Sequence, residues 1–141
     1  MKIVPRVLAL LSMTLTITAQ ADSVRESEIV PVENLKWIAT GLGPLMAAPA
    51  YGDMSKGGHG TFIKFPQGYV TPAHTHTAGY RAIVVSGTMV NSEEGHADVN
   101  MQAGSYWSQK GKHQHVTKCI SNTGCVVFMV QADKFDQISV K

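Results

Sequence analysis

The stretch "GYVTPAHTHTAGYRAIVVSG", residues 68–87, decides how this chain folds. Glycines bound it at both ends, and apolar and polar residues alternate inside it, which is typical of β-strands with one face in a core. His74 and His76 lie two positions apart, so on a strand both imidazoles project from one face, with Cα atoms about 6.6 Å apart. Between Asp53 and Glu93 there is no Asp or Glu. The stretch therefore predicts β-structure that presents two histidines without a neighbouring carboxylate.

Similar short segments continue on both sides of this stretch and are separated by Gly, Pro, Asn or Ser, as in "GTFIKF", "GSYWSQ", "QHVTKCI" and "CVVFMVQA". Several short strands with turns between them are typical of an all-β sandwich or barrel. A chain of 141 residues that is 44% apolar predicts one domain with one core. We expect the following apolar and aromatic residues to supply that core: Phe62, Phe65, Tyr69, Ile83, Val85, Tyr106, Trp107, Val127 and Phe128.

The N-terminal segment, residues 1–21, has the pattern of a secretory signal peptide. Lys2 and Arg6 precede an apolar run, and the segment ends in Ala19-Gln20-Ala21, a small-x-small cleavage pattern. The apolar run is only about half of the roughly 20 residues that a membrane-spanning helix needs. We therefore predict cleavage after Ala21, a mature domain over residues 22–141, and a periplasmic or secreted location.

Without residues 1–21 the chain carries equal numbers of basic and acidic side chains, 10 of each, so its formal charge is zero. No cluster of Lys and Arg remains that would neutralise phosphates, which argues against nucleic acid as a partner. The polar residues also form no face suited to a membrane surface. A small-molecule ligand or substrate is the expected partner, and exposed sheet edges favour a homodimer.

Cys119 and Cys125 flank the turn-forming segment "ISNTG". A hairpin there would place the two cysteines opposite each other, with Cβ atoms about 4.5 to 5.5 Å apart, which is near the distance that a disulfide requires. A chain that folds outside the cytoplasm can keep such a bond. A disulfide and a pair of reduced core thiols both remain open as interpretations.

The histidines recur at intervals that resemble a known family. Gly68, His74, His76 and Gly87 match the first motif of the cupins, small β-barrels that hold a metal with histidines and one glutamate, and the run from Gly104 to His115 is similar to the second motif. This resemblance covers Gly68 to Cys119 and implies an all-β, single-domain cupin barrel of the jelly-roll type. "GTFIKFPQGYVTPAHTH" and "QAGSYWSQKGKHQH" also resemble the subgroup related to anti-sigma-factor cupin domains.

The resemblance implies three metal ligands, His74, His76 and His115, and places Tyr80 where the glutamate would stand. Lys110, Lys112 and Cys119 replace the usual proline, glycine and asparagine of the second motif. Cys119 cannot share an ion with His115, because four residues along one strand separate their Cα atoms by about 13 Å.

The roles of two further residues stay open. Tyr80 is a weak fourth ligand, a hydrogen-bond donor to a bound anion, or part of the barrel wall. His113 forms a second His-x-His pair with His115 and is a fourth ligand, a general base near the barrel mouth, or a solvated side chain. Arg81 is expected on the outer face, and His59 and His96 are expected in loops.

Three neutral imidazoles and a divalent ion would leave a +2 centre with open positions, which favours an anionic, chelating substrate. Iron or zinc suits such ligands best, and nickel, copper and manganese are also candidates. Acetylacetone-cleaving dioxygenases are cupins with a three-histidine iron. The resemblance thus implies a non-haem iron dioxygenase-type enzyme for a β-diketone or a hydroxylated aromatic ketone, with Tyr80 and His113 as catalytic candidates. The other hypothesis is a non-catalytic cupin that binds or senses a metal or small ligand.

Overall fold

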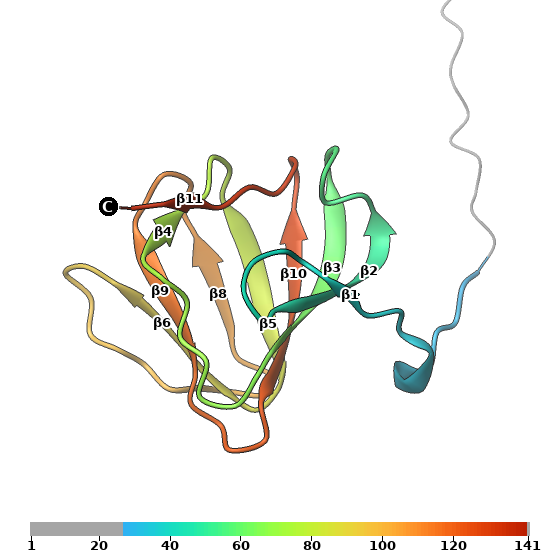
Figure 1. Ribbon diagram of the computed structural model, residues 1–141, viewed down its shortest axis with the longest axis horizontal. Helices are drawn as coiled ribbons and strands as arrows, with labels where there is room; N and C mark the ends of the chain where they lie inside the picture. Colours follow the sequence, from blue (N-terminus) through green and yellow to red (C-terminus); the bar gives the residue numbers. More distant parts are fainter. Residues whose placement is uncertain (1–26, 141) are drawn as a thin grey trace, which may run out of the picture.

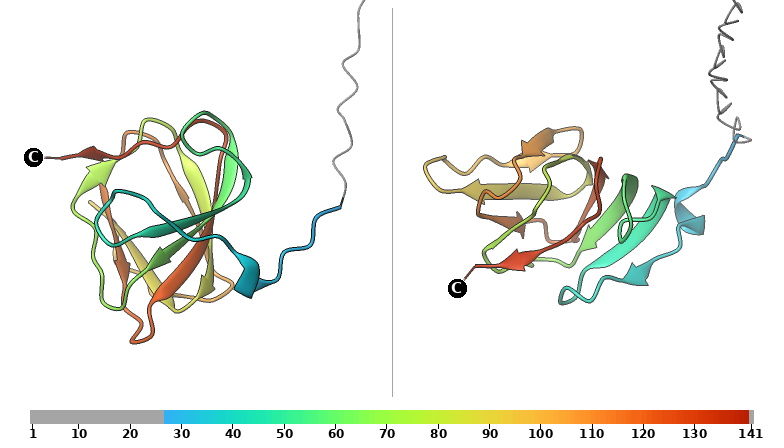
Figure 2. Two further views of the ribbon diagram at one scale, coloured as in Figure 1. Left: turned by 45° about the vertical axis from the view of Figure 1, so that its right-hand side comes forward. Right: turned by 90° about the horizontal axis from the view of Figure 1, so that it is seen from above.

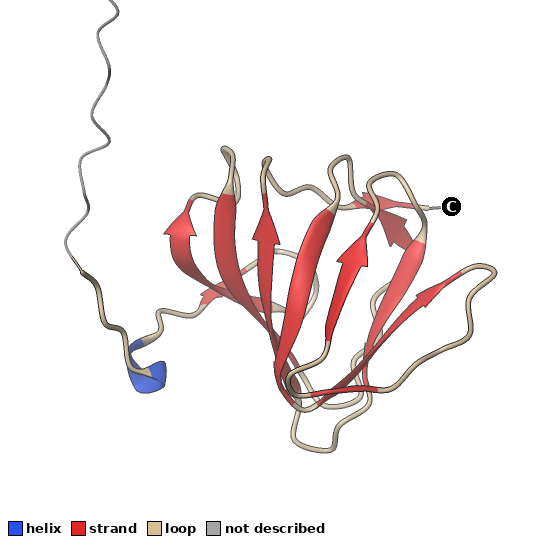
Figure 3. Cartoon of the chain, turned by 180° about the vertical axis from the view of Figure 1, so that it is seen from behind, coloured by secondary structure: helices blue, strands red, loops and turns tan. Residues whose placement is uncertain are grey.

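The computed structural model describes residues 27–140, so the predicted signal peptide lies outside the described residues. Within this range the chain has one single-turn helix, η1 (Val32–Asn34), and no helix long and apolar enough to span a membrane (Figure 3). The rest is strands and loops. The strands are β1 (Ile38–Ala39), β2 (Met46–Gly52), β3 (His59–Phe65), β4 (His74–Thr75), β5 (Tyr80–Ser86), β6 (Thr88–Glu93), β7 (Met101–Gln102), β8 (Tyr106–Gln109), β9 (His115–Cys119), β10 (Cys125–Gln131) and β11 (Ile138–Ser139).

The strands form two antiparallel sheets that enclose a common interior (Figures 1 and 2). The larger sheet has the order β1-β2-β3-β10-β5-β8, and the smaller has the order β11-β4-β9-β6-β7. Strands far apart in sequence are neighbours in both sheets, as with β3 and β10 or β4 and β9, so the chain repeatedly crosses from one sheet to the other. This arrangement confirms the predicted all-β barrel of the jelly-roll type.

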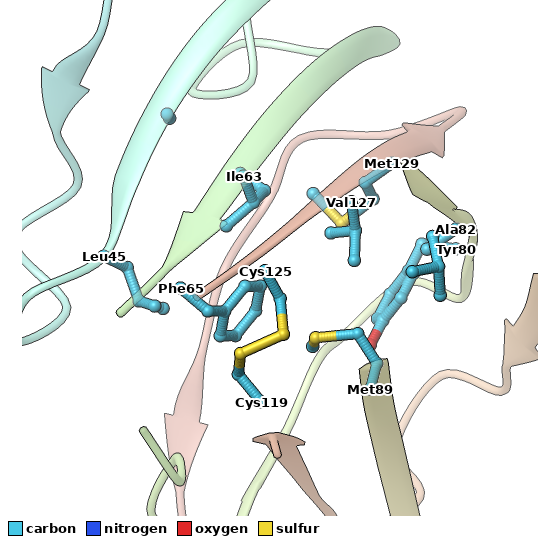
Figure 4. Close-up of a cluster of buried hydrophobic side chains, with 12 residues drawn as sticks. Leu45, Ile63, Phe65, Tyr80, Ala82, Met89, Cys119, Cys125, Val127 and Met129 are labelled. Atoms are coloured by element: carbon cyan, nitrogen blue, oxygen red, sulfur yellow. A yellow bond between two sulfur atoms is a disulfide. The ribbon is translucent and has the colours of Figure 1, made fainter. Parts of the chain in front are cut away.

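The core lies between the sheets and follows the alternation of the strands. On β5, Tyr80, Ala82 and Val84 are buried, whereas Arg81, Ile83 and Val85 are exposed. Phe65 and Val127 are in the core as predicted (Figure 4). Tyr69 and Trp107 are partly buried against it.

The other residues expected in the core are not there. Ile83, Val85 and Tyr106 are exposed, and Phe62 and Phe128 pack against each other on the outer face of the larger sheet, with ring centroids 4.8 Å apart. These strands carry apolar residues at consecutive positions, and successive side chains of a strand point to opposite faces. Both faces are therefore apolar, so hydrophobicity alone does not identify the face that lies in the core. This apolar outer face is consistent with the predicted homodimer, which stays a prediction.

Cys119 and Cys125 form a disulfide, with Cα atoms 5.8 Å apart. The expected hairpin is wrong: Cys119 ends β9 in the smaller sheet, and Cys125 begins β10 in the larger one. The bond therefore connects the two sheets. It lies in the core among Phe65 and Met89 (Figure 4).

His59 is not in a loop, as the glycines before it suggested. It is the first residue of β3 and is 1% exposed. Its Nδ1 is 2.9 Å from Thr61 Oγ1, and its Nε2 is 3.3 Å from Gln131 Oε1 on the neighbouring strand. These contacts satisfy both ring nitrogens, so His59 is a hydrogen-bonded core residue. His96 is exposed and follows a turn, as expected.

Candidate metal centre

Two strands of the smaller sheet bring three histidines together. His74 begins β4, His76 follows that strand directly, and His115 begins β9. The antiparallel register pairs His74 with His115, although 40 residues lie between them in the sequence. The three side chains are buried, and one ring nitrogen from each lies within 4.8 Å of the others. Sheet pairing therefore builds a three-nitrogen cluster inside the barrel.

Backbone carbonyls orient two of these imidazoles in the same way. His74 Nδ1 donates to the carbonyl oxygen of Pro72 at 2.7 Å, and His115 Nδ1 donates to that of His113 at 3.1 Å. Each ring thus bonds to the chain two residues before it. A proton on Nδ1 leaves Nε2 with a free lone pair, and this tautomer suits a metal ligand.

The C-terminal segment, residues 132–140, orients the third imidazole. This segment crosses the barrel end that carries β4 (Figure 1). His76 Nδ1 donates to the carbonyl oxygen of Asp136, and the Phe135 ring packs on the imidazole with centroids 5.0 Å apart. The Asp136 carboxylate in turn accepts hydrogen bonds from Thr77, from its backbone N–H at 2.8 Å and from its hydroxyl at 2.5 Å. The sequence interpretation missed this segment, because a backbone carbonyl leaves no trace in residue type.

The donor set fits a divalent metal. Two imidazoles on one ion, with bonds of about 2.1 Å, have nitrogens no more than about 4.2 Å apart. The observed limit of 4.8 Å is slightly larger, so small ring movements would complete the site. Three neutral nitrogens also leave open positions on the ion for another ligand. The cluster can therefore hold a divalent metal, and imidazole ligands alone do not select which one.

The pKa values of the three histidines are lowered, chiefly by burial, and that of His115 falls to about 4. Unfolded histidine has a pKa of about 6.5, so the unfolded chain takes up protons first as the pH falls. We expect the melting temperature of the metal-free protein to fall between pH 6.5 and about 4 as these histidines charge. Thermal unfolding at successive pH values measures this. A His115→Gln variant should show a shallower fall, and an equally steep one would contradict the assignment.

Tyr80, at the position of the family's glutamate, lies beside the cluster. It begins β5 and is buried, and its hydroxyl is 3.4 Å from His115 Nε2. Because His115 carries its proton on Nδ1, the phenol is the donor in this contact. Burial raises the pKa of Tyr80 to about 12, although Trp107 and Thr117 lower it in part. A neutral phenol that also packs in the wall fits the hydrogen-bond donor better than the fourth ligand.

The structure does not bring His113 to the cluster. Its ring is exposed, and its Nδ1 lies 3.1 Å from Glu93 Oε1 at the surface. Only its backbone carbonyl contributes to the site, through His115. Arg81 is on the outer face, as expected. Neither placement provides a general base inside the barrel.

A cavity of about 50 Å³ lies beside the histidines. At roughly 10 to 15 Å³ per water-sized group, it has room for one small ligand. Its walls are mostly apolar, and none of its lining residues is Asp, Glu, Lys or Arg. Its apolar lining includes Leu45, Ile63, Phe65, Val127 and Met129. A bound divalent ion would be the one formal charge at this cavity wall.

Comparison with known proteins gives the same fold. A family model described as a domain of unknown function, DUF4437, matches residues 28–133. An RmlC-like cupin from Shewanella frigidimarina shares 20% identity, with a TM-score of 0.60 over 75% of this chain and 91% of that one. The polyketide cyclase RemF from Streptomyces resistomycificus shares 15% identity, with a TM-score of 0.67 over 82% and 86%.

A third solved structure, the DMSP lyase DddQ from Ruegeria pomeroyi, shares 17% identity, with a TM-score of 0.61 over 75% of this chain and 61% of that one. A search of curated protein sequences found no match. At these identities the neighbours show the fold alone, and the family model covers most of the chain. This chain therefore has the cupin fold and belongs to the DUF4437 family.

Proposed function

We propose that this chain is a periplasmic metal-dependent cupin enzyme of the non-haem iron dioxygenase type, acting on a small chelating substrate such as a β-diketone or a hydroxylated aromatic ketone. The observation that carries the proposal is the buried three-histidine cluster at the wall of a small apolar cavity. A metal with three protein ligands keeps positions for a substrate, whereas structural sites are usually closed by four. Bound iron would supply Lewis acidity and one-electron chemistry with dioxygen.

The residues around the cluster have separate tasks in this proposal. His74, His76 and His115 hold the ion, and their carbonyl partners keep each Nε2 directed at it. The Tyr80 hydroxyl lies 3.4 Å from His115 Nε2 and would donate a hydrogen bond to a ligand bound beside the ion. The apolar walls exclude water and strengthen electrostatic interactions with an anionic substrate. The absence of a carboxylate ligand leaves the centre with a higher positive charge, which favours such a substrate.

The solved neighbours support an enzyme in a general way. Two of them are named as a cyclase and a lyase, so this fold carries different reactions at low sequence identity. The reaction type proposed here therefore rests on the ligand set. The proposed periplasmic location rests on the signal-peptide pattern and on the Cys119–Cys125 disulfide, because such bonds persist in oxidising compartments.

The second candidate function is a non-catalytic cupin that binds or senses a metal or a small ligand. The small size of the cavity favours it, because about 50 Å³ leaves little space for both a substrate and dioxygen. In this case the three histidines would hold the ion, and a small ligand would occupy the open positions without turnover.

Metal analysis followed by oxygen uptake separates the two functions. We expect the mature protein, purified without added metal, to contain about one divalent ion per chain. The iron-loaded protein should then consume oxygen when acetylacetone or a hydroxylated aromatic ketone is added. Tightly bound zinc, with no oxygen uptake after iron loading, would favour the non-catalytic function. A His96→Ala variant is the matched control, since His96 is exposed and is not in the cluster.

A further inference from the structure

The indole nitrogen of Trp107 is a buried donor without an acceptor. Trp107 lies on β8 opposite Ala82 of β5, and its side chain lines the cavity beside the histidines. Its Nε1 is inaccessible to solvent and has no hydrogen-bond partner among residues 27–140. Folded proteins rarely leave a buried N–H unpaired, so such a group calls for a partner from outside the chain.

The Tyr80 hydroxyl is the second donor at this place. The rings of Tyr80 and Trp107 are in edge contact, with centroids 6.3 Å apart. The phenol oxygen lies 3.4 Å from His115 Nε2, and it is close enough to the Trp107 indole and the Thr117 hydroxyl for both to lower its pKa. His115 Nε2 is the atom a metal would use, because His115 Nδ1 is committed to a carbonyl. Metal binding would therefore take this acceptor away from Tyr80 and leave two neighbouring donors at the cavity wall.

Other polar groups of the cavity are already occupied. The Thr40 hydroxyl donates to the carbonyl of Leu45 at 3.0 Å, and the Thr117 hydroxyl donates to Asn91 Oδ1 at 2.9 Å. The donors at Trp107 and Tyr80 stand out by position, because their rings are neighbours beside the histidines and the indole N–H is fully buried. With a cation beside them and no cationic side chain in the cavity lining, they suit an oxygen that carries negative charge.

We propose that Trp107 N–H and Tyr80 O–H together bind one anionic oxygen of the ligand, and that this ligand is a small carboxylate or enolate with a short apolar substituent. Trp107 is then a specificity-determining residue. The anionic oxygen is recognised by the ion and the two donors, and the substituent by the apolar walls. The cavity size limits the substituent to a few carbon atoms, which favours a small β-diketone over a hydroxylated aromatic ketone. This inference rests on the metal site of the proposed function.

The test uses the zinc-loaded mature protein and isobutyrate as the probe, with acetylacetone as the enolate-forming probe in parallel. The chain has two tryptophans, so a ¹H–¹⁵N spectrum contains two indole signals, and Trp107→Phe assigns them. We expect isobutyrate to shift the Trp107 indole proton downfield as the hydrogen bond forms. The Trp37 indole is the internal control, because its ring packs under Lys64 on another part of the molecule and should not move.

Calorimetry on matched variants gives the size of the effect. Trp107→Phe and Tyr80→Phe should each weaken isobutyrate binding by about 10- to 100-fold, as expected for a hydrogen bond to a charged group. Both should keep zinc affinity close to that of the wild type, and Trp37→Phe should change neither. A preference for isobutyrate would favour a carboxylate ligand, and a preference for acetylacetone would favour an enolate.

The possible failures are distinguishable. If zinc binds but the Trp107 indole does not move and Trp107→Phe binds both probes as tightly as the wild type, the inference is overturned and the metal site stands. If the wild-type protein binds no metal, the proposed function fails, and the inference fails with it. An intact spectrum of each variant, with the Trp37 signal in place, shows that the barrel has folded.

Discussion

Alanine at both His74 and His76 is expected to abolish metal binding. Each variant side chain removes one of three nitrogens, and the remaining His115 provides a single ligand, which cannot hold an ion against water. Metal affinity should fall by more than the roughly 10- to 100-fold that is typical when only a hydrogen-bond partner of a ligand is removed. Elemental analysis after dialysis against a defined concentration of zinc or iron measures the bound metal per chain.

Two single variants control this experiment. His96→Ala changes an exposed histidine outside the cluster, and His113→Ala removes a surface ring but keeps the carbonyl that holds His115. Both should retain the metal. If the double variant keeps its metal, the ion is bound elsewhere and the three-histidine centre is wrong. Equal loss from His113→Ala would instead show that the ring of His113 belongs to the site.

Replacing Asp136 with alanine is expected to weaken metal binding by about 10- to 100-fold without removing any ligand. The Asp136 carbonyl orients His76, and its carboxylate attaches the C-terminal segment to Thr77. Alanine keeps the carbonyl but releases this attachment, so His76 would sample other orientations. Competition with a chromogenic zinc chelator measures the affinity, and the oxidised protein with its disulfide intact is used throughout.

The chain offers a close control for this change in the same segment. Asp133 is exposed, and its carboxylate bonds only to the neighbouring Lys134 N–H among the described residues, so Asp133→Ala should bind zinc as the wild type does. Asp136→Asn retains one acceptor for Thr77 and should lie between the alanine variant and the wild type. Unchanged zinc affinity in Asp136→Ala would show that Phe135 and β11 suffice to place the carbonyl.

The strands and the ligand histidines could be predicted because both depend on local spacing. A period of two identifies a strand, and two histidines at that spacing share a face whatever the strand pairs with. The inner face was harder to identify. Ile83 and Val85 are as hydrophobic as core residues, yet they are exposed because Tyr80, Ala82 and Val84 occupy the inner face of the same strand. His59 was misplaced for a related reason, since its partner Gln131 is 72 residues away in sequence.

The features that complete the site depend on contacts between distant segments. No spacing in the sequence relates His76 to Asp136 or Trp107 to Tyr80, although alternation along "SYWSQ" does put Trp107 on the same face as Gln109. His113 lies outside the barrel because β9 begins only at His115, so the alternation that would put both rings on one face does not extend to His113. A sequence motif lists candidate side chains, and the pairing of strands selects among them.

By itself, the sequence determined that this protein is a β-barrel with His74 and His76 on one face, because strand periodicity is a local property, and the resemblance to the cupin motifs added His115 as the third candidate ligand. Only the tertiary structure decided that β4 and β9 place those histidines within 4.8 Å, that the disulfide joins two sheets, and that the C-terminal segment orients His76. Each of these depends on which strands become neighbours, and that outcome is set by packing of the whole core rather than by any short segment.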